Sequence, residues 1–221
     1  MFFIVIIAIN KPLNIPYLMK TFLRPVVLFT ALLLAPFCHA QEGDILTEED
    51  WNSLIPYLVE EDWINAEKVS GELLKRFKGE EEMLDEAGII RYMYINSIGG
   101  LVGNKDIDKE EALKKLKGFE GKVIVTPFNM YKKGGLFNYL TLSEDGKTWS
   151  KCVANDSATV IHIFETFEMD DKLLIDNAAK YEGKTMRLIA LIKEIKTGGY
   201  AMPRLEITYT STEIWDMEDQ E

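Results

Sequence analysis

The chain has 221 residues, with 36 acidic and 25 basic side chains, so its net charge at pH 7 is −11. An acidic surface repels phosphate backbones and anionic headgroups, and this argues against nucleic acid and anionic membranes as partners. The length is sufficient for one large domain or two small ones, each with its own core.

Residues 1–40 predict an export signal. A short basic segment follows Met19, an apolar run covers residues 26–37, and Ala40 ends the segment. This layout is typical of a secretory signal peptide. The run is too short for a membrane span, which takes about 20 apolar residues. We therefore expect cleavage after Ala40 and a periplasmic or secreted protein, with Met19 as the true start.

Two alternatives to a cleaved signal stay open. If residues 1–18 are translated, their additional apolar side chains favour a longer, uncleaved anchor. Cys38 closes the apolar run and could carry a lipid. The residue before it is Phe37, whereas lipoprotein signals carry a small residue there, so this alternative is the weaker one.

Cleavage at Ala40 leaves Cys152 as the single cysteine and His162 as the single histidine. One cysteine excludes an intrachain disulfide, and one of each residue is too few for a zinc site of cysteines and histidines. We expect Cys152 to be a small buried side chain and His162 to be a strand residue. A nucleophilic pair of the two stays open, although nothing in the sequence marks the cysteine as activated.

The sequence contains no nucleophile elbow, phosphate-binding loop or dinucleotide fingerprint. Residues 104–111 place oxygen ligands at alternate positions, as a calcium loop does. Lys109 stands where that loop needs glycine, so we interpret the segment as a helix cap. We therefore predict no catalytic residue, no cofactor and no metal.

Residues 41–118 predict an acidic helical domain, because apolar residues recur there at spacings of three and four. Thr47 followed by three acids predicts the start of a first helix, and Asp62 the start of a second. A third helix is expected at residues 80–102. It is apolar on most sides, which predicts a central, buried position. Asp108 caps a short fourth helix.

The second helix resembles a tetratricopeptide helix at four positions, and Ala87-Gly88 with Arg91-Tyr92 could belong to its partner. The four positions are Trp63, Ala66, Ser70 and Leu73. No 34-residue repeat accompanies them, so a generic helical bundle is an equal alternative. Arrays of this kind bind proteins or peptides more often than they catalyse reactions.

After residue 121 the apolar period changes to about two, which predicts strands. The fourth expected strand alternates through Val160, His162 and Phe164. A short helix is expected at residues 171–180, and Asp145-Gly146 marks a hairpin turn. The expected strands are 122–126, 137–142, 148–153, 158–167, 185–195 and 205–214.

This order resembles the OB fold, in which a helix lies between the third and fourth strands of a small barrel. Leu173-Leu174, followed by the segment from Tyr181 to Leu188, resembles a passage in exported bacterial OB proteins and in the anticodon-binding-like OB family. The fold class is therefore predicted as α+β, with a four-helix hairpin array before an OB-like barrel at residues 119–216 and an acidic tail at 217–221. The sequence predicts one strand more than the five of an OB barrel, so another small barrel or a β-sandwich remains an alternative.

The OB resemblance implies a ligand surface across the second and third strands, where aromatic and basic side chains gather. The residues of this sequence that match are Phe137, Tyr139, Trp149, Lys132 and Lys151. The alternative is that the aromatic side chains face the core and the lysines protect sheet edges.

These observations together predict an exported, non-catalytic binding or adaptor protein. The helical domain would hold a protein partner, and the barrel would hold a second partner or a small ligand. An envelope hydrolase with its site between the two halves, or a purely structural protein, are the alternatives.

Overall fold

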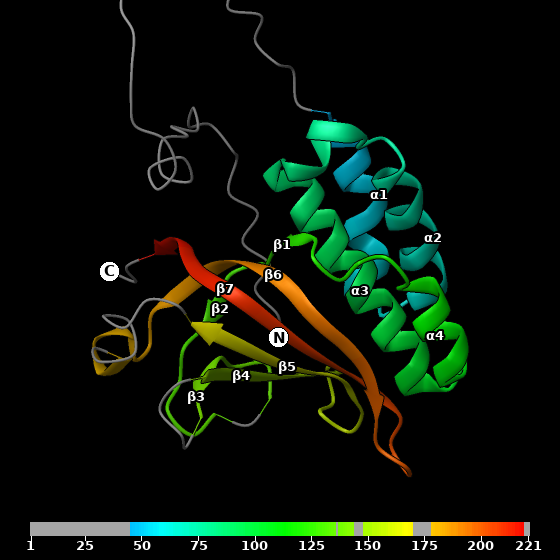
Figure 1. Ribbon diagram of the computed structural model, residues 1–221. Helices are drawn as coiled ribbons and strands as arrows, with labels where there is room; N and C mark the ends of the chain where they lie inside the picture. The colour runs from blue at the N-terminus through cyan, green and yellow to red at the C-terminus, as the bar shows by residue number, and fades with distance from the viewer. Residues whose placement is uncertain (1–44, 136, 144–147, 170–177, 219–221) are drawn as a thin grey trace, which may run out of the picture. The chain divides into compact units, whose positions relative to one another are not determined.

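The computed structural model describes residues 45–135, 137–143, 148–169 and 178–218 (Figure 1). The expected signal peptide lies outside these residues, as does most of the helix expected at 171–180. The segment Asp44–Glu221 forms one compact unit.

Helices come first along the chain and strands follow, so the fold class is α+β, as predicted. The helical elements are α1 (Glu48–Val59), α2 (Trp63–Leu74), the 3-10 turn η1 (Gly79–Met83), α3 (Asp85–Asn104), α4 (Lys109–Lys115) and the 3-10 turn η2 (Ala178–Tyr181). The strands are β1 (Val123–Val125), β2 (Asn129–Met130), β3 (Thr141–Leu142), β4 (Thr148–Ala154), β5 (Ile161–Met169), β6 (Thr185–Gly198) and β7 (Arg204–Glu218).

Three predicted helix caps are confirmed. Thr47 and Asp50 form a reciprocal capping box, with Asp50 N donating to Thr47 Oγ1 at 3.3 Å and Thr47 N donating to Asp50 Oδ2 at 2.8 Å. Asp62 accepts from Asn65 N at 3.2 Å, and Asp108 accepts from Glu111 N at 2.8 Å. These bonds satisfy backbone donors that a helix start leaves unpaired.

The third helix begins later than predicted. Residues 79–83 form η1, Leu84 is extended, and α3 starts at Asp85 and ends before Lys105, whose φ of 68° is left-handed. Fourteen of the twenty residues of α3 are buried, as expected for a helix without a polar face.

Glycines let α3 approach its neighbours closely. A Cβ on Gly99 would lie 2.5 Å from Ile163 Cγ1 of β5, and one on Gly88 would lie 2.9 Å from Val125 Cγ2 of β1. On the side facing α2, a Cβ on Gly100 would lie 2.2 Å from the Trp63 ring. Helix α3 therefore contacts both α2 and the sheet at distances that no other residue type permits (Figure 1).

The strands form an open sheet in the order β1-β6-β7-β5-β4-β3, with β2 also paired to β6. The pair β5–β7 is parallel and the other strand pairs are antiparallel. Within the described residues, a single bridge between Tyr131 and Leu140 links β2 to β3. The OB-like barrel that the sequence predicted is thus not shown as a closed barrel.

The strands expected at residues 122–126 and 137–142 do not form over their full length, which explains why the sheet is open. Only the short strands β1, β2 and β3 form there, with Pro127 and the turn glycine Gly134 (φ 71°) between them. Asn138 has a left-handed φ of 59°, and its amide side chain pairs with the backbone of Ala154, so residues 137–140 do not continue a strand.

The buried side chains of β5 change phase near the beginning of the strand. Ile163, Glu165 and Phe167 are buried, whereas Phe164 is 38% exposed. His162 is nevertheless buried, because it lies at the strand's beginning beneath α3. A register shift beside it, between Val153 and Ala154 of β4, separates these two phases.

One apolar core joins α3 and α4 to the sheet, and a second lies among α1, α2 and the first turns of α3. The first contains Ile95, Ile98, Ile163, Leu188 and Tyr209, among others. The second contains Leu46, Leu54, Ala66, Leu73, Phe77, Ala87 and Ile90. The change from helix to strand falls between Lys115 and Val123, and the larger core continues across it.

We predict that Gly99→Ala lowers the free energy of unfolding by about 1–2 kcal/mol. The added Cβ collides with Ile163, an overpacking that costs about 1–3 kcal/mol, while alanine regains up to about 1 kcal/mol of helix propensity. Urea unfolding followed by circular dichroism measures the difference. The exposed Asn52→Ala change in α1 is the control and should be neutral or slightly stabilising. Equal stability of the two variants would show that α3 can move away from β5.

Candidate functional site

The five residues predicted to bind a ligand fall in two separate places. Trp149 and Lys151 lie on the buried face of β4. The Trp149 ring stacks on Tyr131, with centroids 4.8 Å apart, and meets the edge of Tyr181 at 6.4 Å. Trp149 is thus a core side chain, because its strand presents alternate residues to the interior.

Lys132, Phe137 and Tyr139 lie between β2 and β3. Lys132 is exposed, and the two aromatic side chains are half-buried. The ammonium of Lys132 lies 5.1 Å from the centre of the Tyr139 ring, within the range of a cation–π contact. Of the predicted set, these are the side chains that reach the surface.

A buried polar cluster surrounds Glu165, whose side chain is fully enclosed. Tyr92 of α3 donates to Glu165 Oε2 at 3.0 Å, and Tyr209 of β7 donates to Oε1 at 2.9 Å. The Lys151 ammonium lies 4.0 Å from Oε2. One carboxyl group therefore links a helix and three neighbouring strands.

The cluster continues from Lys151 towards β2. Lys151 Nζ donates to Asn129 Oδ1 at 2.5 Å and to the Tyr92 hydroxyl at 3.3 Å. Asn129 Nδ2 donates to Thr126 Oγ1 at 3.0 Å, and that hydroxyl oxygen also accepts from Leu188 N at 3.0 Å. Each buried polar group named here thus has a partner, as buried polar groups require.

Burial sets the electrostatics of the cluster. It raises the pKa of Glu165 and lowers the pKa of Lys151, so the charged form of each group is less favoured than it is in water. Burial and the neighbouring carboxyl together raise the pKa of Tyr92 and Tyr209, which keeps both hydroxyls protonated as donors. Glu165 and its partners are closed to solvent, so the cluster stabilises the fold and offers no surface to a substrate.

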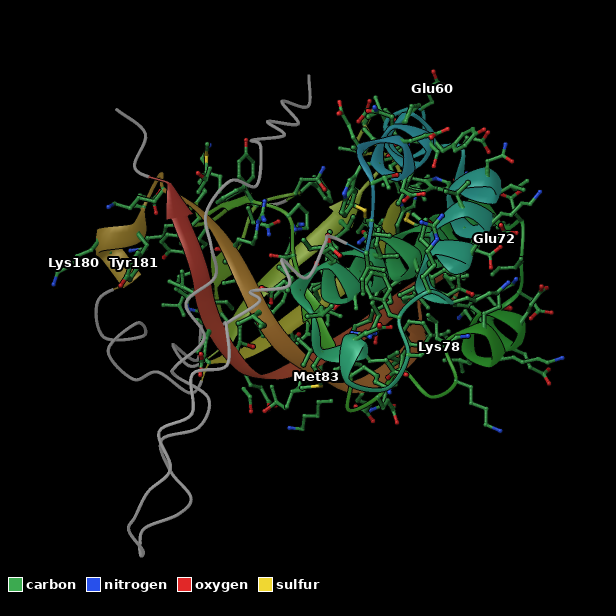
Figure 2. All side chains as sticks on the ribbon, turned by 90° about the horizontal axis from the view of Figure 1, so that it is seen from above. Glu60, Glu72, Lys78, Met83, Lys180 and Tyr181 are labelled. Carbon is green, nitrogen blue, oxygen red and sulfur yellow. The ribbon has the colours of Figure 1, made fainter. Side chains whose placement is uncertain are left out.

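A groove of about 510 Å³ lies on the helical part, between α2, α3 and the segment after α4. Its lining residues are Glu67, Lys68, Gly71, Glu72, Leu74 and Lys75, with Tyr94 and Phe119. The groove is a shallow hollow that is open to solvent. Figure 2 shows Glu72 at the outer side of α2, pointing away from the sheet.

Aromatic stacking and one shared carboxylate build the floor of the groove. Tyr94 and Phe119 stack with centroids 5.6 Å apart and planes 14° from parallel. Glu67 Oε1 accepts from the Tyr94 hydroxyl at 3.1 Å and from Lys115 Nζ at 3.2 Å. Burial, together with the charge of Glu67, raises the pKa of Tyr94.

Gly71 lets the Tyr94 ring lie close against α2. A Cβ at this position would lie 3.0 Å from Tyr94 Cε2, and the missing side chain leaves room for that ring beside α2. Glycine within a helix costs about 1 kcal/mol relative to alanine. The rim carries the exposed side chains of Lys68, Glu72 and Lys75. The groove therefore combines an apolar aromatic floor with charges of both signs.

A second hollow of about 570 Å³ is formed by α4 alone. Its lining residues are Asp108, Glu110, Glu111, Lys114 and Lys115. Residues from a single short helix give charge but no opposing wall, so this hollow is a part of the charged surface.

Cys152 and His162 do not have the properties of a nucleophilic pair. Burial raises the pKa of the half-buried Cys152 thiol and lowers the pKa of His162 to about 4. A thiolate–imidazolium pair needs the reverse, a lowered cysteine pKa and a raised histidine pKa. Within the described residues, no group of three or more histidine, cysteine or acidic side chains is placed to hold a metal. Among the same residues, no helix has the length and apolar character of a membrane span.

Comparison of the chain with protein-family models, with curated proteins and with solved structures gave no match.

Neither the cluster around Glu165 nor the aromatic floor of the groove was predicted from the sequence. A signal for the first was present, because Glu165 stands between Ile163 and Phe167 in a run where alternate residues are apolar. The partners Tyr92 and Tyr209 are 73 and 44 residues away along the chain. No local pattern connects them.

We predict that Glu165→Leu lowers the free energy of unfolding by about 3–5 kcal/mol, because it leaves Lys151 buried without its carboxyl partner. In the double variant Glu165→Leu/Lys151→Met, apolar groups replace both members. It should recover at least about 2 kcal/mol of that loss. Urea unfolding of the two single variants and the double variant completes the cycle. If the double variant loses the sum of the two single losses, the two groups do not interact.

Proposed function

We propose that the protein is an exported, non-catalytic binding protein whose helical part holds an extended segment of a protein partner in the groove between α2 and α3. The observation that carries this proposal is the floor of stacked Tyr94 and Phe119, packed against Gly71 and surrounded by exposed charges. Aromatic side chains in a concave site are the usual anchors of protein recognition.

The charges around this floor suit a peptide more than a small apolar ligand. Glu67 is already neutralised by Lys115, whereas Lys68, Glu72 and Lys75 extend along the rim. Lys68 and Lys75 are seven residues apart, which places them on one side of α2 about 10 Å from each other. An extended segment could contact both lysines while one of its side chains covers the Tyr94–Phe119 pair.

The absence of catalysis is proposed on the chemistry of the described residues. Burial raises the pKa values of Glu165, Tyr92 and Tyr209, and these three groups belong to a closed cluster. The groove, which is open, offers one shared carboxylate and lysines but no activated nucleophile beside a base. A hydrolase therefore has no observation in its favour.

The finer fold assignment is also a proposal. We propose that the sheet is an interrupted relative of the OB barrel, supported by η2 between β5 and β6 and by the closing β6–β7 hairpin. OB barrels are themselves partly open. The pairing of α2 with α3 supports a tetratricopeptide-like arrangement, since Ala66, Ser70 and Leu73 are buried. A second ligand surface would then rest on Lys132, Phe137 and Tyr139.

We expect Phe119→Ala and the double variant Lys68→Glu/Lys75→Glu each to weaken partner capture at least tenfold. Loss of a central aromatic anchor costs about 2 kcal/mol or more, and charge reversal adds repulsion at the rim. The measurement is quantitative pull-down from an envelope fraction with the immobilised protein, after circular dichroism has shown that each variant is folded.

Lys180→Glu is the matched control, because it reverses an exposed lysine of η2 that belongs neither to the helical groove nor to the second proposed surface. It should capture the same partner as the unchanged protein. Equal capture by the groove variants and the control would remove the groove from the proposal.

A further inference from the structure

The contact between Trp63 and His162 joins the helical pair α1–α2 to the sheet. The two rings meet edge to face, with centroids 5.2 Å apart and planes at 82°. His162 is 1% exposed. Its ring fills space beside α3 that only glycine leaves free, since a Cβ on Gly103 would lie 2.6 Å from His162 Cδ2.

Neither ring has a polar partner at the contact. Among the described residues, His162 Nε2 and Trp63 Nε1 are buried and accept or donate no hydrogen bond. A neutral imidazole tolerates an apolar setting, but an imidazolium there would be a buried charge without compensation. The contact is therefore stable only while the imidazole is neutral.

The carboxylates nearest to the contact form hydrogen bonds with other groups and not with the His162 ring. At the start of α2, the Asp62 carboxylate accepts from Asn65 N and from Asn65 Nδ2 at 2.6 Å. Before it, Glu61 Oε1 accepts at 2.7 Å from Asp156 N in the β4–β5 turn. On β5, the Glu165 carboxylate is bonded to two tyrosines.

The other packed elements bring no charge to the ring. Helix α3 contacts it through glycine, and the first ionisable residue beyond, Lys105, is exposed. The β4 residue opposite Ile161 is Ala154. Accordingly, burial alone lowers the pKa of His162 from 6.5 to about 4.

We propose that the Trp63–His162 contact is a pH-sensitive clasp, in which protonation of His162 releases the corner between α1 and α2 from the sheet while the sheet stays folded. Release would expose the Trp63 ring next to Val59 and Ile64, which are already 50% and 63% exposed. Acidification would thus enlarge an apolar patch at this corner.

The direction follows from the two protonation equilibria. The open corner has the ordinary histidine pKa, and the closed corner has a lower one, so the closed form is fully favoured above pH 6.5 and loses this advantage as the pH falls towards 4. Between pH 7 and pH 5 the ratio of open to closed corner rises about 20-fold.

Hydrogen exchange on the full chain tests the clasp at both pH values, after correction for intrinsic exchange. Ala66 N, which donates to Asp62 O in the first turn of α2, reports on the corner. Leu188 N, which donates to Thr126 Oγ1, reports on the sheet. We expect the protection of Ala66 to fall about 20-fold from pH 7 to pH 5 and that of Leu188 to stay constant. Unchanged protection at Ala66, or an equal loss at both amides, overturns the clasp.

His162→Leu removes the titrating group and should abolish the pH dependence at Ala66. His39→Gln changes the other histidine of the chain and is the matched control, with the full response retained. If His162→Leu retains that response, the proposal is wrong.

The control variant also gives a measurement that needs no change at the clasp. In His39→Gln, His162 is the only histidine, so its imidazole resonances titrate alone. A midpoint near 4 is expected, and a midpoint near the ordinary value of about 6.5 would contradict a closed contact.

Discussion

The fold depends on the burial of α3 between α2 and the sheet. A helix enclosed on both sides cannot use long side chains at every position, and Gly88, Gly99 and Gly100 supply the close approaches to β1, β5 and α2. The same helix carries Tyr92, whose hydroxyl reaches the carboxyl of Glu165 in the middle of the sheet. Apolar packing brings the layers together, and this directional bond defines how α3 lies over the strands.

This constraint separates the groups that stabilise the molecule from those that can meet a partner. Every strong perturbation of tyrosine, glutamate and lysine pKa values around Glu165 arises from burial in the layer interface. Perturbed groups often mark active sites, but structural networks produce the same signature. The groove beside Tyr94 is open to solvent and carries exposed side chains at its rim. Accessibility therefore decides the functional assignment, and the size of a pKa change does not.

Features set by neighbouring residues could be predicted from the sequence, and features set by distant contacts could not. The caps at Thr47, Asp62 and Asp108 depend on groups three residues apart, and the structure confirms them. The inward face of β5 depends on α3 and on a register shift in β4, so alternation in the sequence alone does not show that Glu165 is buried and Phe164 is exposed. The end of the strand expected at residues 137–142 likewise depends on the pairing of the Asn138 side chain with the backbone of Ala154. Tyr94 and Phe119 build a floor only once α2 and α3 are packed.

Helix α2 connects the two proposals physically. Its first residue, Trp63, rests on His162, and the groove residues Gly71 and Leu74 follow two to three turns later on the same rigid element. Tyr94, in the floor of the groove, belongs to α3, which the bond from Tyr92 to Glu165 holds on the sheet. Movement of the first turn of α2 would therefore change the distance between α2 and this floor, because α2 moves and α3 is fixed. A partner that contacts both α2 and the floor would in turn oppose release of Trp63, since binding and opening share one helix.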